Sequence, residues 1–304
     1  MNLNELVNRN KEYTKHGNVA NYIPELSKAN PNCLGVAVAK CGESVIAAGD
    51  SNIKFTIQSI SKPLILIMAL LDYGEEIVFS KVGKEPTGDS FNSIRRLETI
   101  NEFTKPYNPM INAGAIAISS LIKGKSNNEK IERILNFIRK LSNNNDIKIN
   151  MDVYLSEKRT GNKNRAMAYF LKDIGILEGD VEEILDLYFM HCSIEADIID
   201  LANIARVLAC AGKDPLTNEV IIPRRIVQIV NTLMTTCGMY DESGEFAVNV
   251  GLPSKSGVGG GIMTVVPGKM GIAVYAPALD KKGNSVAGVK LLEDISNEYN
   301  LSIY

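Results

Sequence analysis

Histidine and tryptophan are scarce in this sequence of 304 residues, which has two histidines, His16 and His191, and no tryptophan. A Ser-His-Asp or Cys-His catalytic group, or a metal site made of several histidines, would have to draw its imidazole from those two residues. The composition therefore favours a reaction that uses another base. We expect neither a metal site nor a cofactor.

The sequence also lacks an excess of charge, a long apolar run and an apolar leader. Lysine and arginine number 33 against 35 aspartate and glutamate, a formal charge of -2, so no basic surface indicates a nucleic-acid partner. The longest apolar run, 63–71, is far shorter than the roughly 18 residues of a membrane span. Residues 1–15 are polar and do not resemble a secretory signal. We expect a cytoplasmic protein with no membrane partner.

Cysteine usage points to the same compartment. The five cysteines are scattered, odd in number and form no C-x-x-C pair. Such usage is typical of reduced, mostly buried thiols in a cytoplasmic protein. We therefore expect reduced thiols at Cys33, Cys41, Cys192, Cys210 and Cys237.

Strand patterns lie at the two ends of the sequence, and helix patterns fill the middle. Short β-type runs predict one hairpin within 34–48 and another within 261–276. Apolar residues at spacings of three and four predict helices between them, including one from 59 to about 73, ended by Gly74, and one over 195–211. We predict an α/β (α+β) fold with one antiparallel sheet flanked by helices. Residues 1–60 and 224–304 would form the sheet domain and 61–223 an inserted all-helical subdomain, with the active site between them.

The sharpest local motif is QSISKP at residues 58–63. Ser59 and Lys62 are three residues apart, which places both side chains on one face of a helix, and Pro63 requires the helix to begin close to Ser59. A buried lysine that loses its proton can activate a serine hydroxyl in place of histidine. Alternatively, Ser59 merely caps a helix and Lys62 lies on the surface.

The second motif is KSGVGGG at residues 255–261, which leads directly into a predicted strand. Its glycines allow the backbone to approach a ligand closely, with the Val258 N–H directed into a site. The alternative is an ordinary glycine-rich approach to a hairpin. An S-x-x-K motif at the head of a helix, followed far downstream by Lys-Ser-Gly opening an edge strand, resembles serine β-lactamases and penicillin-binding proteins. The pair predicts a serine–lysine acyl-transfer site on a β-lactamase/transpeptidase-like fold.

Further segments make the resemblance more specific. Matching segments occur in family order over nearly the whole chain, and they are similar to those of the serine-dependent glutaminase family, which shares the β-lactamase-like fold. The chain resembles the short bacterial type. The matching segments are 21–24, 48–50, 58–62, 86–93, 108–115, 156–166, 188–193 and 251–261.

The resemblance implies hydrolysis of L-glutamine to L-glutamate and ammonia through a γ-glutamyl ester on Ser59, with Lys62 as the base. The N–H groups of Ser59 and Val258 would form the oxyanion hole. Tyr22 and Tyr240 match the family's active-site tyrosines, which relay a proton to the leaving ammonia or orient Lys62. Ser59, Tyr240 and Val258 would also contact the substrate.

Four further positions match those that hold the α-amino and α-carboxylate groups of glutamine: Asn112, Glu157, Asn164 and Tyr188. A carboxylate suits an ammonium, and neutral amides and phenols suit a carboxylate, so the chemistry agrees with these assignments. Each residue taken singly could equally be a turn or core residue. The role of Lys255 is open between catalysis and structure. The resemblance also implies a homodimer or homotetramer.

Two rival functions use the same residues. A β-lactamase or penicillin-interactive serine acyl-transferase would share both motifs, and turnover of a chromogenic cephalosporin would reveal it. A catalytically inactive amino-acid sensor would keep Glu157, Asn112 and Asn164, but the intact Ser59 and Lys62 argue against it. We expect His191 to be structural.

Overall fold

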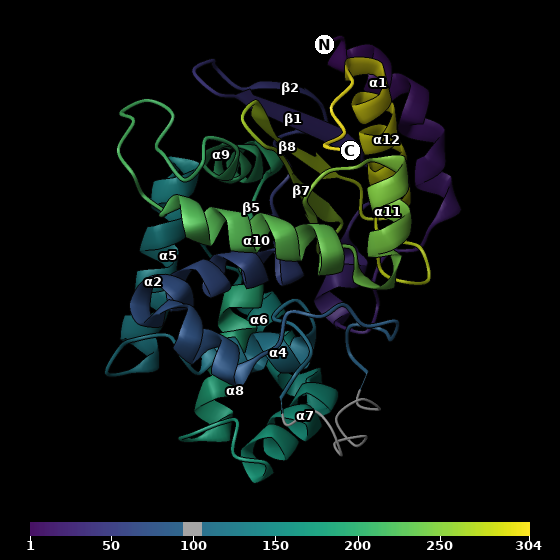
Figure 1. The fold of residues 1–304 in the computed structure, drawn as a ribbon. Helices are drawn as coiled ribbons and strands as arrows, with labels where there is room; N and C mark the ends of the chain where they lie inside the picture. Colours follow the sequence, from purple (N-terminus) through teal and green to yellow (C-terminus); the bar gives the residue numbers. More distant parts are fainter. Residues whose placement is uncertain (94–104) are drawn as a thin grey trace.

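The computed structural model describes residues 1–93 and 105–304, and a five-stranded antiparallel sheet lies at the centre of its upper half (Figure 1). The strand order is β2-β1-β8-β7-β6, so β1 pairs with β8 and joins the two ends of the chain. The predicted antiparallel sheet flanked by helices is confirmed. The strands are β1 (Gly35–Lys40), β2 (Ile46–Gly49), β6 (Ser254–Ser256), β7 (Gly261–Val266) and β8 (Met270–Tyr275).

Helices cover both faces of this sheet because both faces are apolar. Alternate residues of the central strands contribute to two separate hydrophobic cores, as the two-residue period of a strand requires. Helix α9 (Ile198–Ala209) packs across one face. Helices α1 (Leu3–Asn10) and α12 (Val286–Tyr299) lie side by side over the other, near both chain ends (Figure 1).

The remaining helices gather mostly below the sheet in Figure 1. The first of them, α2, begins close to the predicted start. Gly74 takes a non-helical conformation with φ of 76° and ψ of 176°, so the helical segment that begins at Ser61 ends there, as predicted, and a second segment follows to Lys81. These helices are α2 (Ser61–Lys81), α4 (Asn112–Ser119), α5 (Asn127–Ser142), α6 (Met151–Thr160), α7 (Asn162–Asp173), α8 (Val181–Cys192), α10 (Arg224–Cys237) and α11 (Ser243–Asn249).

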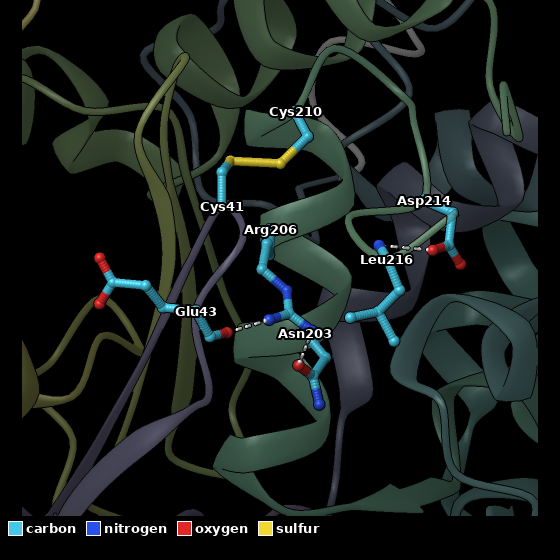
Figure 2. Close-up of a disulfide and its surroundings, with 7 residues drawn as sticks. All are labelled: Cys41, Glu43, Asn203, Arg206, Cys210, Asp214 and Leu216. Carbon is cyan, nitrogen blue, oxygen red and sulfur yellow. Dashed lines mark hydrogen bonds between the residues drawn. A yellow bond between two sulfur atoms is a disulfide. The ribbon is translucent and has the colours of Figure 1, made fainter. Parts of the chain in front are cut away.

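A disulfide joins Cys41, directly after β1, to Cys210, directly after α9 (Figure 2). Their Cα atoms are 6.4 Å apart, within the range of disulfides. Arg206 donates a hydrogen bond of 2.9 Å to the Glu43 carbonyl of the same hairpin. The disulfide and this hydrogen bond both attach the hairpin to α9. The expectation of free thiols is wrong for this pair, because the two cysteines are 169 residues apart in sequence and become neighbours only when α9 packs on the sheet. Three cysteines are free and buried: Cys33, Cys192 and Cys237.

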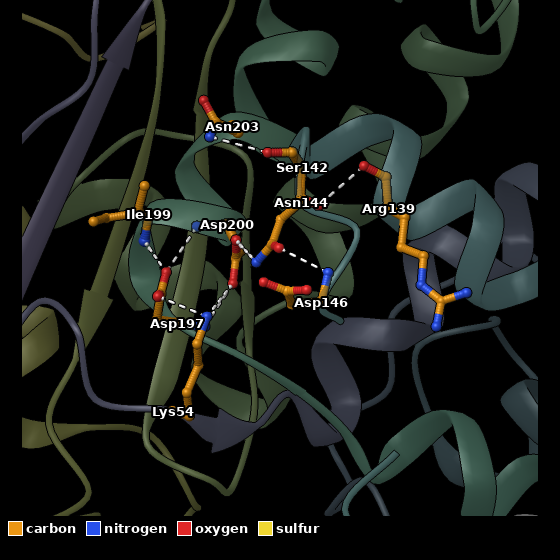
Figure 3. Close-up of polar contacts among 9 residues, drawn as sticks. All are labelled: Lys54, Arg139, Ser142, Asn144, Asp146, Asp197, Ile199, Asp200 and Asn203. Carbon is orange, nitrogen blue, oxygen red and sulfur yellow. Dashed lines mark hydrogen bonds and ion pairs between the residues drawn. The ribbon is translucent and has the colours of Figure 1, made fainter. Parts of the chain in front are cut away.

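The helix predicted over 195–211 is a strand followed by a helix. Strand β5 (Ile194–Ala196) lies between β3 (Phe55–Thr56) and β4 (Lys148–Ile149) in a second small sheet. Asp197 then caps α9, and Asp200 completes the capping box, which sets the start of the helix. Both carboxylates bind Lys54 Nζ, at 2.8 and 2.9 Å (Figure 3). Lys54 therefore anchors β3, the segment that precedes the QSISKP motif.

Within residues 1–93 and 105–304, none of the helices combines the length and the apolar character needed to cross a bilayer. The division of the chain into a sheet domain and a helical subdomain stays a prediction. Helix α9, which belongs to the central segment in that division, contacts the sheet.

Candidate active site

Ser59 lies in a single 3-10 turn, Gln58–Ile60, directly before α2 begins at Ser61. Gln58 has φ of 48°, an uncommon value for a residue with a side chain, and the Ser61 N–H donates to the carbonyls of Gln58 and Ser59. Pro63 occupies the first turn of α2, where its missing N–H needs no partner. The motif therefore presents Ser59 at the head of a helix, as predicted.

The glycine-rich motif packs against the turn that carries Ser59. A Cβ at Gly257 would lie 2.5 Å from the Ile57 carbonyl oxygen, and one at Gly259 would lie 2.3 Å from that of Thr56. Glycine is required at both positions because any side chain would push the two backbone segments apart. The close approach is thus to the chain before Ser59, and it brings Val258 beside the turn that carries Ser59.

A cavity of about 260 Å3 opens beside Ser59. Its size is at the lower end of small-molecule pockets, which suits a ligand as small as an amino acid. Six of the residues predicted from the sequence line it: Tyr22, Ser59, Asn112, Glu157, Asn164 and Tyr188. The other three predicted residues, Lys62, Tyr240 and Val258, are not part of its lining.

Lys62 is fully buried, with 1% of its surface exposed. Its Nζ donates to the Met110 carbonyl at 3.0 Å and to Asn112 Oδ1 at 2.7 Å. Burial lowers the pKa of Lys62 to about 8, against the opposing effects of Cys192 and Glu157. A neutral lysine has two hydrogens and one lone pair. Both hydrogens are therefore used on these two acceptors, which leaves the lone pair of the neutral amine free.

Asn112 connects Lys62 to the cavity. Because its Oδ1 accepts from Lys62, its Nδ2 faces the other way and donates to Asn164 Oδ1 at 3.0 Å. The same logic leaves the Nδ2 group of Asn164 available to donate to a ligand. Two amides from α4 and α7 are thus fixed in orientation by one lysine.

Glu157, on α6, is 94% buried, and its Oε2 has no hydrogen-bond partner. Burial raises the pKa of its carboxyl group to about 8, although Lys62 and Gln58 both pull it downward. An unpartnered buried carboxylate is costly unless a positive group approaches it. The cavity that Glu157 lines therefore suits a ligand with an ammonium group.

Two of the predicted tyrosines lie near Ser59. Tyr240 donates to the Ser256 carbonyl at 3.2 Å; burial raises its pKa, and a contact with the Ser59 hydroxyl partly offsets this rise. Tyr22 lines the cavity and exposes 54% of its surface; burial and the charge of Glu157 raise its pKa well above the ordinary value.

Lys255 is buried and does not line the cavity. Its Nζ donates to the carbonyls of Gly238 and Ser256 at 2.9 and 2.7 Å and lies 4.4 Å from the centre of the Tyr240 ring. Burial lowers its pKa well below the ordinary value, and Lys62 adds to this effect. Lys255 therefore contacts the backbone and ring around Tyr240 rather than the cavity.

Sequence reasoning did not select every residue of the cavity wall. Gln58 adjoins Ser59 in the motif, so its position was a usable signal. The others lie in segments used for the family resemblance but carry no motif of their own: Ile23, Phe91, Asn92, Thr160, Gly161, Lys163 and Cys192. In the described part of the chain, no three His, Cys, Asp or Glu side chains are grouped to hold a metal ion.

Comparisons with known proteins agree on one family. A sequence profile of the glutaminase family matches residues 17–304. A glutaminase of Clostridioides difficile (strain 630) is 58% identical over 302 residues, which are 99% of this chain and 97% of that relative. A glutaminase of Fusobacterium nucleatum subsp. nucleatum is 57% identical over 303 residues, 99% of each chain. A solved Bacillus subtilis glutaminase, in covalent complex with 5-oxo-L-norleucine formed from 6-diazo-5-oxo-L-norleucine, has a TM-score of 0.91 and 39% identity, covering 99% of this chain and 98% of its own.

Proposed function

The chain belongs to the glutaminase family and is a glutaminase, and from this we propose that it hydrolyses L-glutamine through a γ-glutamyl ester on Ser59. The observation that carries the proposal is the buried Lys62, whose two amine hydrogens are used by Met110 and Asn112 while its lone pair stays free. The covalent complex of the Bacillus subtilis relative supports a nucleophile in this family.

In the first half-reaction, Lys62 takes the hydroxyl proton as Ser59 Oγ attacks the side-chain amide carbon of glutamine. The N–H groups of Ser59 and Val258 stabilise the oxyanion that develops on the carbonyl oxygen. The C–N bond then breaks, and the proton held by Lys62 passes to the leaving nitrogen, with Tyr240 as the relay, so that ammonia departs. The described residues include no hydrogen bond between Ser59 Oγ and Lys62 Nζ, a contact that catalytic groups often form only with substrate bound.

In the second half-reaction, Lys62 removes a proton from water, which attacks the ester carbonyl. The ester bond to Ser59 Oγ breaks, Ser59 regains a proton from Lys62, and glutamate leaves. Glu157 receives the α-ammonium group throughout. The free amide hydrogens of Asn164, with Asn112 and the hydroxyls of Tyr22 and Tyr188, face the α-carboxylate.

Release of ammonia and glutamate from glutamine by purified protein, measured beside a Ser59→Ala variant, tests this proposal. We expect turnover in the wild-type protein and loss of it by about 10^4-fold or more in the variant, because the alanine cannot form the ester. A chromogenic cephalosporin should not be turned over. Unchanged activity in the variant would contradict the assignment of Ser59.

A cytoplasmic location and a homodimer or homotetramer remain proposals that rest on composition and family. Three free buried thiols agree with a reducing compartment. The disulfide between Cys41 and Cys210 counts against it, because such bonds are rare in the cytosol. Cell fractionation measures the first property and sedimentation equilibrium the second.

A further inference from the structure

His191 is completely buried in the last turn of α8 and joins three helices of the site. Its Nδ1 lies 2.8 Å from Ser61 Oγ, at the start of α2, and its Nε2 lies 2.9 Å from Ser119 Oγ, at the end of α4. Tyr188, one turn earlier on α8, packs its ring edge-on against the imidazole with centroids 5.3 Å apart. The imidazole thus links the helix that follows Ser59 to the helices that carry Asn112 and Tyr188.

The hydrogens around this imidazole do not suffice for all its contacts. Ser61 Oγ also lies 2.8 Å from the Gln58 carbonyl, and Ser119 Oγ lies 2.8 Å from the Ala115 carbonyl. Burial, with the charge of Lys62, lowers the pKa of His191 to about 3, so the ring is neutral and has one N–H. Cys192 Sγ also lies 3.9 Å from Nδ1, a long contact to which the thiol brings its own hydrogen. Two hydroxyl hydrogens and one ring hydrogen must serve the four shorter contacts. One carbonyl therefore loses its serine donor.

The two carbonyls are not equivalent. Ala115 lies within α4, where helix geometry already supplies its carbonyl with a backbone donor. The Gln58 carbonyl shares the Ser61 N–H with the carbonyl of Ser59, in a turn where Gln58 itself has a positive φ. The hydrogen bond from Ser61 to the Gln58 carbonyl is therefore more stabilising than the one from Ser119 to the Ala115 carbonyl. The favoured arrangement has His191 Nδ1–H donating to Ser61 and Ser119 donating to Nε2.

We propose that His191 is a positioning residue of the glutaminase reaction: its Nδ1–H fixes Ser61 Oγ against the Gln58 carbonyl and so holds the turn that presents Ser59. The imidazole touches neither the cavity nor the reacting atoms, and it acts through Ser61. The proposal rests on the proposed role of Ser59. It predicts that the Ser61 contact matters to the chemical step and that the Ser119 contact matters little.

Two substitutions separate these contacts. The amide nitrogen of asparagine in His191→Asn matches the position of Nδ1 and keeps the donor to Ser61. The longer side chain of His191→Gln matches Nε2 and reaches Ser119 instead. We expect kcat of H191Q to be at least about tenfold below that of H191N, a difference of about 1.4 kcal/mol, with KM similar in both because Glu157 and Asn164 are unchanged. His16→Asn, at an exposed position, is the matched control and should leave kcat unchanged.

Equal kcat in the two variants, or an effect confined to KM, would overturn the proposal, provided that the wild-type protein hydrolyses glutamine. If it does not, the proposed function fails instead. If either variant does not fold, the tautomer of His191 in the wild-type protein tests the proposal instead. The chain has only two histidines, so 15N spectra of histidine-labelled protein resolve His191 with H16N as the assignment control. We expect a protonated Nδ1 and an unprotonated Nε2, and the reverse would overturn the proposal.

Discussion

Lys62 and Glu157 are two buried ionisable residues that the proposed reaction needs in their deprotonated forms. Burial lowers the pKa of Lys62 and raises that of Glu157, each to about 8. Below that pH, Lys62 holds a proton and has no lone pair, and Glu157 has no charge for an ammonium. Deprotonation of Lys62 and deprotonation of Glu157 are therefore both expected to increase activity.

The first prediction is that kcat/KM rises steeply with pH towards about 8, with a slope of about two on a logarithmic plot below pH 7, because each group adds roughly a factor of ten per pH unit. In Glu157→Gln the slope should fall to about one. Since the charge of Glu157 raises the pKa of Lys62, its loss should also move the remaining rise to lower pH. Initial-rate ammonia assays from pH 5.5 to 9 measure the slope and the position of the profile for the wild-type protein and for Glu157→Gln. A flat wild-type profile with chemistry rate-limiting would contradict this account.

At the scale of single residues, the sequence predicted candidate site residues, six of which line one cavity, but not the partners of their side chains. Ser59 and Lys62 stand out because a short motif encodes their spacing. The unpartnered Oε2 of Glu157 and the link from Lys62 through Asn112 to Asn164 depend on which helices meet, and a single sequence does not encode that locally. The same holds for His191, which we expected to be structural.

At the scale of the secondary-structure elements, the loop over residues 257–260 has a tight packing requirement next to the site. Its glycines lie against the carbonyls of Thr56 and Ile57, so that β7 begins beside the turn that carries Ser59. Any added side chain must displace one segment from the other.

The second prediction compares two glycine-to-alanine substitutions. Gly259→Ala should lower the free energy of unfolding by about 1–3 kcal/mol and kcat by about 100-fold, because the new Cβ would lie 2.3 Å from a backbone oxygen and shift Val258. Gly244→Ala, in α11, is the control, because no atom lies within 4 Å of its Cβ position. Thermal melts and ammonia assays measure both effects. If Gly259→Ala and Gly244→Ala had the same kcat and the same free energy of unfolding, the loop would not be what positions Val258.

Elements were predictable where their pattern is local. The two hairpins follow from short β-type runs and turn residues, and the start of α2 follows from Pro63. Strand β5 escaped prediction because it has three residues, and its pairing with β3 and β4 is non-local. The break at Gly74 was predictable because glycine takes a positive φ readily, but the helical segment that follows it to Lys81 was not predicted.

For the whole molecule, the disulfide between Cys41 and Cys210 ties the β1–β2 hairpin to α9 across 169 residues of sequence. None of the residues that line the cavity lies on β1, β2 or α9. The bond therefore constrains the unfolded chain more than it shapes the site.

The third prediction follows from this separation. Replacing both cysteines by serine should lower the free energy of unfolding by about 2–5 kcal/mol relative to the oxidised protein and leave kcat within about twofold. Denaturant melts with and without reductant measure the first effect. The reductant should destabilise the wild-type protein and leave the double variant unaffected, and a loss of activity matching the loss of stability would contradict the separation.

The central claim is that Ser59 is the nucleophile, and covalent trapping tests it most directly. Purified protein treated with 6-diazo-5-oxo-L-norleucine should gain one 5-oxo-L-norleucine group per chain, and peptide mass spectrometry should locate it on Ser59. Glutamine in excess should slow the labelling. An adduct on Cys192, which also lines the cavity, or on Ser61, or no adduct in a protein that hydrolyses glutamine, would contradict the account.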